Sequence, residues 1–247
     1  MTFRVQWYGD VASTNDIALA AAEADAAEGL VIAADRQTRG RGRLGRAWSS
    51  PSGAGLYASI LLRPSAAVLP LLTLACGVAV ADAVDVATGV PLALKWPNDA
   101  CVWRDNRWLK VAGILTEAGV TGSGRHYAVV GIGINVRPGG HESDVQQRAT
   151  DLEAECGHEV ERTSLLTHCL AAVQTRYRQL QDFSGGRQGL LDAWRERASA
   201  TLGRAVAWDS AGTTTRGTAD DIDGEGALLI RTATGVERVT AGEVRWI

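Results

Sequence analysis

The chain has 247 residues, 46% of them hydrophobic and 21% charged, which is enough apolar material for one large domain or two modest ones with a buried core. This composition excludes disordered and fibrous proteins. The formal net charge of −3 provides no general cationic field for a polyanion such as duplex DNA, so any contact with nucleic acid has to be local.

The sequence predicts neither a membrane segment nor a disulfide-rich fold. The longest apolar run, residues 66–81, contains Pro70, Thr73 and Gly77 and is shorter than the ~20 residues of a membrane span. The cysteines stand far apart, with no C-x-x-C pair and no histidine at zinc-ligand spacing: Cys76, Cys101, Cys156 and Cys169. We therefore expect a cytoplasmic protein with reduced thiols and no membrane contact.

The first half of the chain predicts a sheet with two helices. Ser13, with Asp16 three residues later, offers an N-cap to an alanine-rich helix at 17–27, and Pro70 opens a long buried helix that reaches residue 86. Apolar or alternating runs predict strands at 5–8, 30–35, 55–62, 92–95, 100–103, 108–118 and 127–135. Because Asp105-Asn106 and other tight turns join consecutive strands, the sheet should be mixed or antiparallel.

The last third changes character. Helices are expected at 164–181 and 188–200, and short strands with frequent turn residues follow at 205–208, 215–219, 227–231, 236–239 and 244–247. We therefore predict an α+β fold in two parts, a larger domain over residues 1–200 and a small β-barrel over residues 203–247.

The segment from Gln37 to Trp48 reads Gln-Thr-Arg-Gly-Arg-Gly-Arg-Leu-Gly-Arg-Ala-Trp. Its glycines let the backbone approach a ligand, and its arginines offer forked donors to phosphate or carboxylate oxygens. An RNA-binding Arg-Gly tail is one alternative, although this single copy lies between two predicted core strands. A nucleotide P-loop is another, but no Gly-Lys-Ser/Thr follows. A loop that wraps a small acid and a nucleotide phosphate fits best.

Only two of the 25 basic residues are lysines, Lys95 and Lys110, which makes both candidates for a position that needs a compact ammonium group. Lys95 begins Lys-Trp-Pro-Asn-Asp, in which a strand ends in a rigid turn that carries Asn98 and Asp99. Such a turn could hold a nucleotide and its magnesium, or it could be an ordinary polar turn. Lys110 enters an apolar strand, where it serves a site or extends to water from an edge.

Two weaker patterns complete the set. Gly131-Ile-Gly133-Ile-Asn135 lacks the third glycine of a dinucleotide fingerprint, but glycines within a strand suit a flat ligand lying on the backbone. Ser13, Thr14 and Asn15 place three short polar side chains at a helix start, where capping and ligand binding are compatible.

In this order, the polar helix start, the Gly-Arg-Gly-Arg loop, Lys-Trp-Pro-Asn-Asp, the Lys110-x-Ala-Gly-Ile-Leu strand and the Gly-x-Gly-x-Asn strand resemble the biotin protein ligases over nearly the whole chain. The resemblance implies a catalytic domain related to class II aminoacyl-tRNA synthetases, followed by an SH3-like domain. It also implies a two-step reaction in which biotin and MgATP give biotinyl-5′-AMP, and biotin then passes to a lysine of a biotin carboxyl carrier protein.

The resemblance assigns the catalytic role to Lys110 and Arg43. It places biotin against Ser13, Thr14, Asn15, Gln37, Gly40, Arg41, Gly42, Arg43, Lys110 and Gly113. It places ATP against Arg41, Arg43, Arg46, Trp48, Lys95, Asn98, Asp99 and Asn135, with Asp99 as a ligand of magnesium. A homodimer formed through a sheet edge is compatible with the family.

Two features depart from the family pattern. Arg39 stands where the family often has a small residue, and only twelve residues precede Ser13, too few for an N-terminal winged-helix domain, so we expect no specific DNA binding. A lipoate or octanoate ligase or transferase of the same fold is the alternative enzyme. A non-catalytic RNA-binding module that uses the Arg-Gly loop is the alternative outside enzymes.

Overall fold

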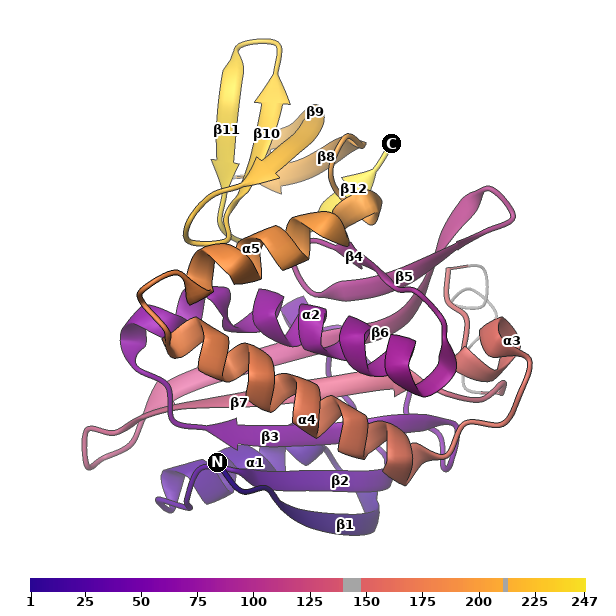
Figure 1. Cartoon of the computed structure of the whole chain (residues 1–247), viewed down its shortest axis with the longest axis vertical. Helices are drawn as coiled ribbons and strands as arrows, with labels where there is room; N and C mark the ends of the chain where they lie inside the picture. The colour runs from indigo at the N-terminus through magenta and orange to yellow at the C-terminus, as the bar shows by residue number, and fades with distance from the viewer. Residues whose placement is uncertain (140–147, 211–212) are drawn as a thin grey trace.

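A computed structural model describes residues 1–139, 148–210 and 213–247 of the chain. Its larger part is built on a seven-stranded sheet in the order β1-β2-β3-β7-β6-β5-β4 (Figure 1). Only β1 and β2 run parallel, and every other neighbouring pair is antiparallel. The strands are β1 (Arg4–Val11), β2 (Leu30–Gln37), β3 (Gly55–Leu62), β4 (Ala93–Lys95), β5 (Asp99–Arg104), β6 (Arg107–Val120) and β7 (His126–Asn135). The predicted mixed sheet is confirmed.

Helices cover the two faces of this sheet unequally. On the face toward the viewer in Figure 1 lie α2 (Leu69–Thr88), α4 (Arg162–Gln181) and α5 (Gly186–Glu196), with the short α3 (Leu152–Cys156) at one end. On the other face, α1 (Thr14–Glu23) buries Ala18 and Ala22 against Leu61 and Val129. Because α1 covers only part of that face, the remainder over β7, β6 and β5 is left for a pocket.

Helix α2 is apolar on nearly all sides. The segment Ala66–Thr88 spans 23 residues, and an 18-residue stretch of it has a mean hydropathy of 2.1, so it is long and apolar enough to cross a membrane, contrary to the expectation from residues 66–81 alone. In the structure 72% of that 18-residue stretch is buried, because the helix lies between the sheet and α4. Its apolar surface is therefore that of a core helix. The four cysteines are free thiols.

The C-terminal part is a five-stranded antiparallel sheet in the order β11-β10-β9-β8-β12, which confirms the predicted small β domain. Its strands are β8 (Ala205–Ser210), β9 (Thr213–Ile222), β10 (Leu228–Thr232), β11 (Gly235–Val239) and β12 (Val244–Trp246). One hydrophobic core runs without a break from the large sheet through α2 into this part.

Hydrogen bonds also join the two parts at the end of β4. Thr201, which is 3% exposed, accepts from the Trp96 backbone N–H at 2.8 Å and donates to Leu94 O at 2.9 Å. The indole of Trp96 donates to Gly226 O at 2.9 Å. The strand that leads into Pro97, Asn98 and Asp99 is thus held directly by the C-terminal part.

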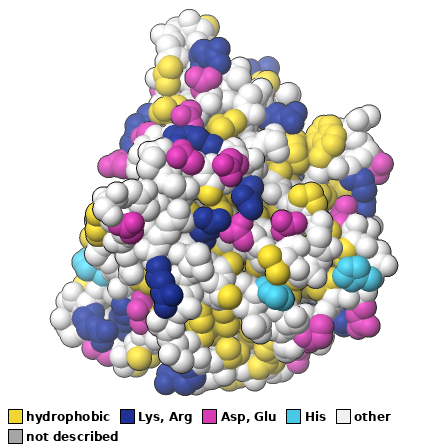
Figure 2. All heavy atoms as spheres, in the orientation of Figure 1, with side chains coloured by type: hydrophobic (Ala, Val, Ile, Leu, Met, Phe, Trp, Pro, Cys, Tyr) yellow, Lys and Arg dark blue, Asp and Glu magenta, His cyan; other side chains and the backbone are white. Residues whose placement is uncertain are grey.

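Local details differ from the predicted boundaries by a few residues. Helix α1 starts at Thr14 and ends at Glu23, before Asp25 takes up a φ of 60°. The predicted turn at Asp105-Asn106 is confirmed, and both residues have the positive φ of a type I′ hairpin turn. Charges of both signs are interspersed on the face shown in Figure 2, in keeping with the small net charge.

Candidate active site

A pocket lies on the part of the sheet that α1 leaves uncovered. Strand β6 contributes Lys110, Gly113, Ile114 and Leu115 to its lining. Because side chains alternate across a strand, Gly113, Leu115 and Glu117 point to the same face. Gly113 pairs with Gly133 on β7 and with Asp99 on β5, and Asp99 pairs with Lys95 on β4. These pairings form a row that crosses the sheet on the face of the pocket.

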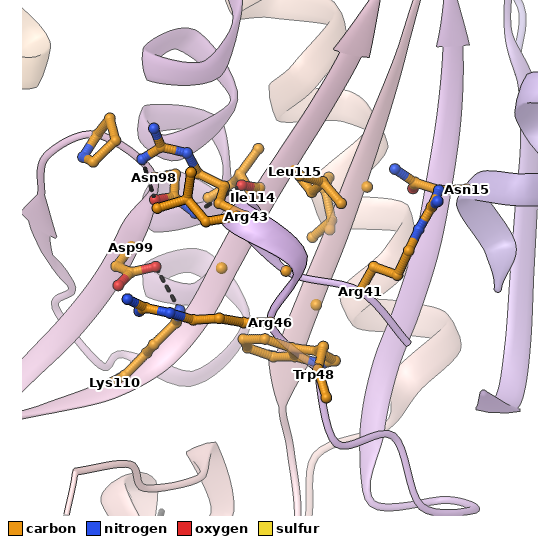
Figure 3. Close-up of a pocket in the computed structure, with 18 of the residues that line it drawn as sticks. Asn15, Arg41, Arg43, Arg46, Trp48, Asn98, Asp99, Lys110, Ile114 and Leu115 are labelled. Atoms are coloured by element: carbon orange, nitrogen blue, oxygen red, sulfur yellow. Dashed lines mark hydrogen bonds and ion pairs between the residues drawn. The ribbon is translucent and has the colours of Figure 1, made fainter. Parts of the chain in front are cut away.

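Lys110 points to the same face of the sheet as this row because of a β-bulge. In a regular strand it would point away from Gly113, which lies three positions later. The β5–β6 register shifts, however, so that Ala100 pairs with Ala112 and Cys101 with Lys110. The extra residue in β6 returns Lys110 to the pocket face, where its Nζ lies 2.5 Å from Asp99 Oδ1. Figure 3 shows this ion pair at one end of the pocket.

The loop between β2 and β3 covers the middle of the pocket. Arg43 reaches across it and donates to Asn98 Oδ1 at 3.3 Å, and Asn98 Nδ2 in turn donates to Ile114 O at 2.9 Å (Figure 3). Burial lowers the pKa of Arg43, an effect that nearby Asp99 opposes. A half-buried guanidinium next to a polar turn is a site prepared for an anion.

Trp48, from the same loop, lies on the glycine pair of the sheet. A Cβ atom on Gly133 would come within 2.6 Å of its indole, and one on Gly113 within 3.0 Å. The Lys110 Nζ lies 5.0 Å from the centroid of the indole ring. Of the two glycines predicted to receive a flat ligand, Gly131 and Gly133, only Gly133 receives a flat side chain in this structure, since a Cβ atom on Gly131 would instead meet Asn15.

A chain of polar groups forms the opposite end of the pocket. Gln37 Oε1 accepts from the backbone N–H of Thr14 at 2.9 Å and from its hydroxyl at 3.0 Å, and Gln37 Nε2 donates to Ser50 Oγ at 2.9 Å. Ser59 Oγ lies 2.7 Å from Thr14 Oγ1 and 2.5 Å from Asn15 Oδ1. These fixed donors and acceptors can recognise a small planar polar group through hydrogen bonds.

The capping prediction for Ser13 was half right. Ser13 occupies the N-cap position with extended backbone angles, but its side chain makes no capping hydrogen bond. Gln37 on β2 takes a helix-capping part instead, since its side chain accepts the N–H of Thr14. The start of α1 is therefore held by a side chain from β2.

The C-terminal part supplies groups that sequence reasoning missed. Glu243 forms an ion pair with Arg46, and this hydrogen bond lowers the pKa of Glu243 and raises that of Arg46. Trp246 lies under Lys95, with the Nζ 3.7 Å from its ring centroid, and burial lowers the pKa of Lys95. No local signal in the sequence connects either residue to a site so far away.

Ser59 was also missed, although a serine within the apolar run of β3 is a local signal that could have identified it.

Most predicted site residues line this one pocket: Ser13, Thr14, Asn15, Gln37, Arg41, Gly42, Arg43, Arg46, Trp48, Lys95, Asn98, Asp99, Lys110 and Gly113. Gly40 and Asn135 do not. The carbonyl of Gly40 accepts the backbone N–H of Trp48 at 2.9 Å. The side chain of Asn135 donates to Thr150 O at 3.0 Å. Arg39 is exposed and does not line the pocket.

Comparison with known proteins identifies the family. The model of the Biotin/lipoate A/B protein ligase family matches residues 9–135, and that of the Biotin protein ligase C terminal domain matches residues 201–245.

Among curated relatives, the chain is 33% identical to the Bifunctional ligase/repressor BirA of Bacillus subtilis, over 96% of this chain and 72% of that protein. It is 33% identical to the Biotin–[acetyl-CoA-carboxylase] ligase of Paracoccus denitrificans, over 94% of this chain and 96% of that protein.

A solved structure agrees with these matches. The biotin protein ligase from Aquifex aeolicus, in complex with biotin and ATP, superposes with a TM-score of 0.82 at 29% identity and covers 99% of both chains. This chain therefore belongs to the biotin/lipoate A/B protein ligase family and, within it, to the biotin protein ligases.

Proposed function

We propose that this protein activates biotin with ATP and transfers it to a lysine of a carrier protein. The observation that carries the proposal is the convergence on one pocket of a polar cluster around Gln37, an arginine loop that includes Arg43, and the ammonium of Lys110. The three features come from separate segments of the sequence, and together they match the three groups that must meet to form an acyl adenylate: the polar head of the acid, its carboxylate and the phosphate of ATP.

The polar end of the pocket is suited to the ureido ring of biotin. Thr14, Asn15 and Gln37 are held by one another and by Ser59, so their orientation is set before a ligand arrives. Fixed hydrogen-bonding groups discriminate well between a ring that carries N–H and C=O groups and one that lacks them. Such a cluster favours biotin over lipoate, whose dithiolane ring cannot pair with it.

The opposite end is suited to the nucleotide. Arg43 and Arg46 project from the loop over the pocket (Figure 3). Lys95 is the last residue of β4, and Asn98 follows in the turn after it. Guanidinium groups bind phosphate through two parallel hydrogen bonds, and Trp48 offers an aromatic face to the adenine. The glycines at 113 and 133 leave room for this indole against the sheet.

In the first step an oxygen of the biotin carboxylate attacks the α-phosphorus of ATP, the bond to the β-phosphate oxygen breaks, and pyrophosphate leaves with the electron pair. Lys110 lies beside Asp99 at the nucleotide end, where its ammonium would bridge the α-phosphate and the biotin carboxylate that extends from the polar end. In the second step the neutral amine of the carrier lysine attacks the acyl carbon, AMP leaves, and the amine loses a proton. Neither step needs a covalent enzyme intermediate.

The pocket suits a magnesium ion that arrives on the triphosphate. Within the described residues no group of three or more His, Cys, Asp or Glu gathers, and the pocket wall carries two carboxylates, Asp99 and Glu243. Magnesium in nucleotide sites is held by one or two carboxylates together with substrate phosphates. Asp99 would serve as this ligand, and the ion would neutralise charge on the leaving pyrophosphate.

Three further proposals rest on the arrangement of this pocket and on the family to which the chain belongs. Residues 1–200 would bind both substrates while residues 203–247 complete the nucleotide end through Glu243. The carrier would be the biotin carboxyl carrier protein of a biotin-dependent carboxylase. The cytoplasm would be the compartment, in keeping with four free thiols and a core-buried α2.

The test is ATP–pyrophosphate exchange with biotin or lipoate as the acid, followed by mass spectrometry of the quenched mixture. We expect exchange, and a mass for biotinyl-5′-AMP, when the acid is biotin and not when it is lipoate. When a purified carrier domain is added, we expect biotin to be transferred to it. Exchange with lipoate and none with biotin would contradict the proposal, as would RNA binding without any adenylate.

A further inference from the structure

Glu117 is a carboxylate that the reaction scheme above leaves without a role. It lies on β6 two positions beyond Leu115, a residue of the pocket wall, and points to the same face of the sheet. It pairs in register with Val129, which packs under α1. Glu117 is therefore located where the start of α1, the arginine loop and the sheet meet.

One contact of this carboxylate is with the polar cluster. Asn15 Nδ2 donates to Glu117 Oε2 at 2.7 Å, while Asn15 Oδ1 lies 2.5 Å from Ser59 Oγ. A carboxylate only accepts hydrogen bonds, so the Asn15 amide must turn its NH₂ group toward Glu117 and its oxygen toward Ser59. Gly131 permits this, because a Cβ atom there would come within 2.4 Å of Asn15 Oδ1.

The other contact is with the loop. Arg41 Nη2 lies 3.0 Å from Glu117 Oε2 and 3.3 Å from Oε1, and 2.7 Å from Asp16 Oδ1. The side chains of Arg41 and Glu117 are 40% and 32% exposed, so this ion pair alone is weak. Figure 3 shows Arg41 and Asn15 side by side, at the end of the pocket away from Lys110 and Asp99.

We propose that Glu117 is a positioning residue that sets the orientation of the Asn15 amide and, through Arg41, fastens the loop over the same end of the pocket. It would thereby control how tightly the head of the acid substrate is bound, without touching that substrate. This inference rests on the proposed function, because it assumes that the polar end receives the biotin head.

Glu117→Gln tests the proposal with little change in shape. The new amide presents either an oxygen or an NH₂ group to Asn15, and it removes the charge that holds Arg41. We expect the dissociation constant of biotin, measured by calorimetry, to rise about 10-fold, because the charged acceptor of the Asn15 hydrogen bond is replaced by a neutral one or by a donor. The kcat of pyrophosphate exchange at saturating biotin should stay within about threefold, since Lys110 is far from the change.

Two matched variants separate the contacts. Asp16→Asn removes the other carboxylate from Arg41 and leaves the Asn15 contact in place, so it should weaken biotin binding less than Glu117→Gln does. Asp10→Asn breaks an exposed ion pair with Arg36 and should have no effect. In a double variant with Asn15→Ala, Glu117→Gln should add less than it does alone, because the two groups are coupled.

Unchanged biotin affinity in Glu117→Gln would overturn the proposal. So would a loss equal to that of Asp16→Asn, since Glu117 would then act on the loop alone, or a fall in kcat with unchanged affinity. Failure of the unsubstituted protein to bind biotin would instead refute the proposed function, so the two failures are distinguishable.

Discussion

Replacing Lys110 with arginine keeps the positive charge of the pocket but changes its shape. The ammonium has Asp99 on one side, with Oδ1 2.5 Å from Nζ, and the Lys110 side chain is 31% exposed. The indole of Trp48 lies on a second side, with its ring centroid 5.0 Å from Nζ. A planar guanidinium is wider than the ammonium it replaces and cannot take its position without displacing one of these groups.

The expected loss follows from the role of the charge. A group that stabilises developing charge in the transition state contributes about 100- to 1,000-fold to kcat, and Lys110→Arg should lose most of this factor. Biotin affinity should change much less, since the polar cluster around Gln37 lies at the other end of the pocket. Lys110→Met, which removes the charge altogether, should lose at least as much activity.

The assay is single-turnover formation of biotinyl-5′-AMP, quenched in acid, together with calorimetry for biotin and thermal unfolding for the fold. Arg36→Lys, an exposed residue outside the pocket, is the control for a change of basic side chain. Adenylation within about threefold of the unsubstituted protein in both Lys110 variants would refute the reasoning that places this ammonium at the reacting atoms.

Three further predictions concern the surroundings of the pocket. Gly133→Ala puts a methyl group within 2.6 Å of the Trp48 indole, so it should displace this ring and raise the KM for ATP without unfolding the protein; an unchanged KM would contradict the stacking. Thr201→Val leaves two buried main-chain groups unpaired, which costs about 1–3 kcal/mol and should lower Tm by about 2–4 °C per kcal/mol. Scanning calorimetry measures this, and an unchanged Tm would show that the bridge adds nothing. The Arg46 hydrogen bond lowers the pKa of Glu243 from 4.5, so the stability it provides is present above pH 4.5 and is lost as the pH falls through the lowered value. The Tm difference between the unsubstituted protein and Glu243→Gln should therefore be constant near neutral pH and shrink in acid, and a difference independent of pH would contradict the ion pair.

The sequence by itself determined most of the elements and the chemical inventory, although the short α3 (Leu152–Cys156) was not predicted. Strand β3 carries the bounds predicted from its apolar run, and the type I′ turn at Asp105-Asn106 follows from residues that tolerate a positive φ. The Arg-Gly loop, the Lys-Trp-Pro-Asn-Asp turn and the polar helix start could be recognised because each is a local arrangement of residue types. Local patterns such as these are set by short-range sterics and hydrogen bonding, which the order of residues specifies directly.

Tertiary structure decided which way these residues face and what they meet. Alternation along β6 would point Lys110 away from Gly113, and only the bulge in its pairing with β5 returns it to the pocket. Glu243 reaches the same pocket from the C-terminal part, where no nearby residue marks it as functional. Register and domain packing depend on contacts between residues distant in the sequence, so a pattern read along the chain cannot specify them.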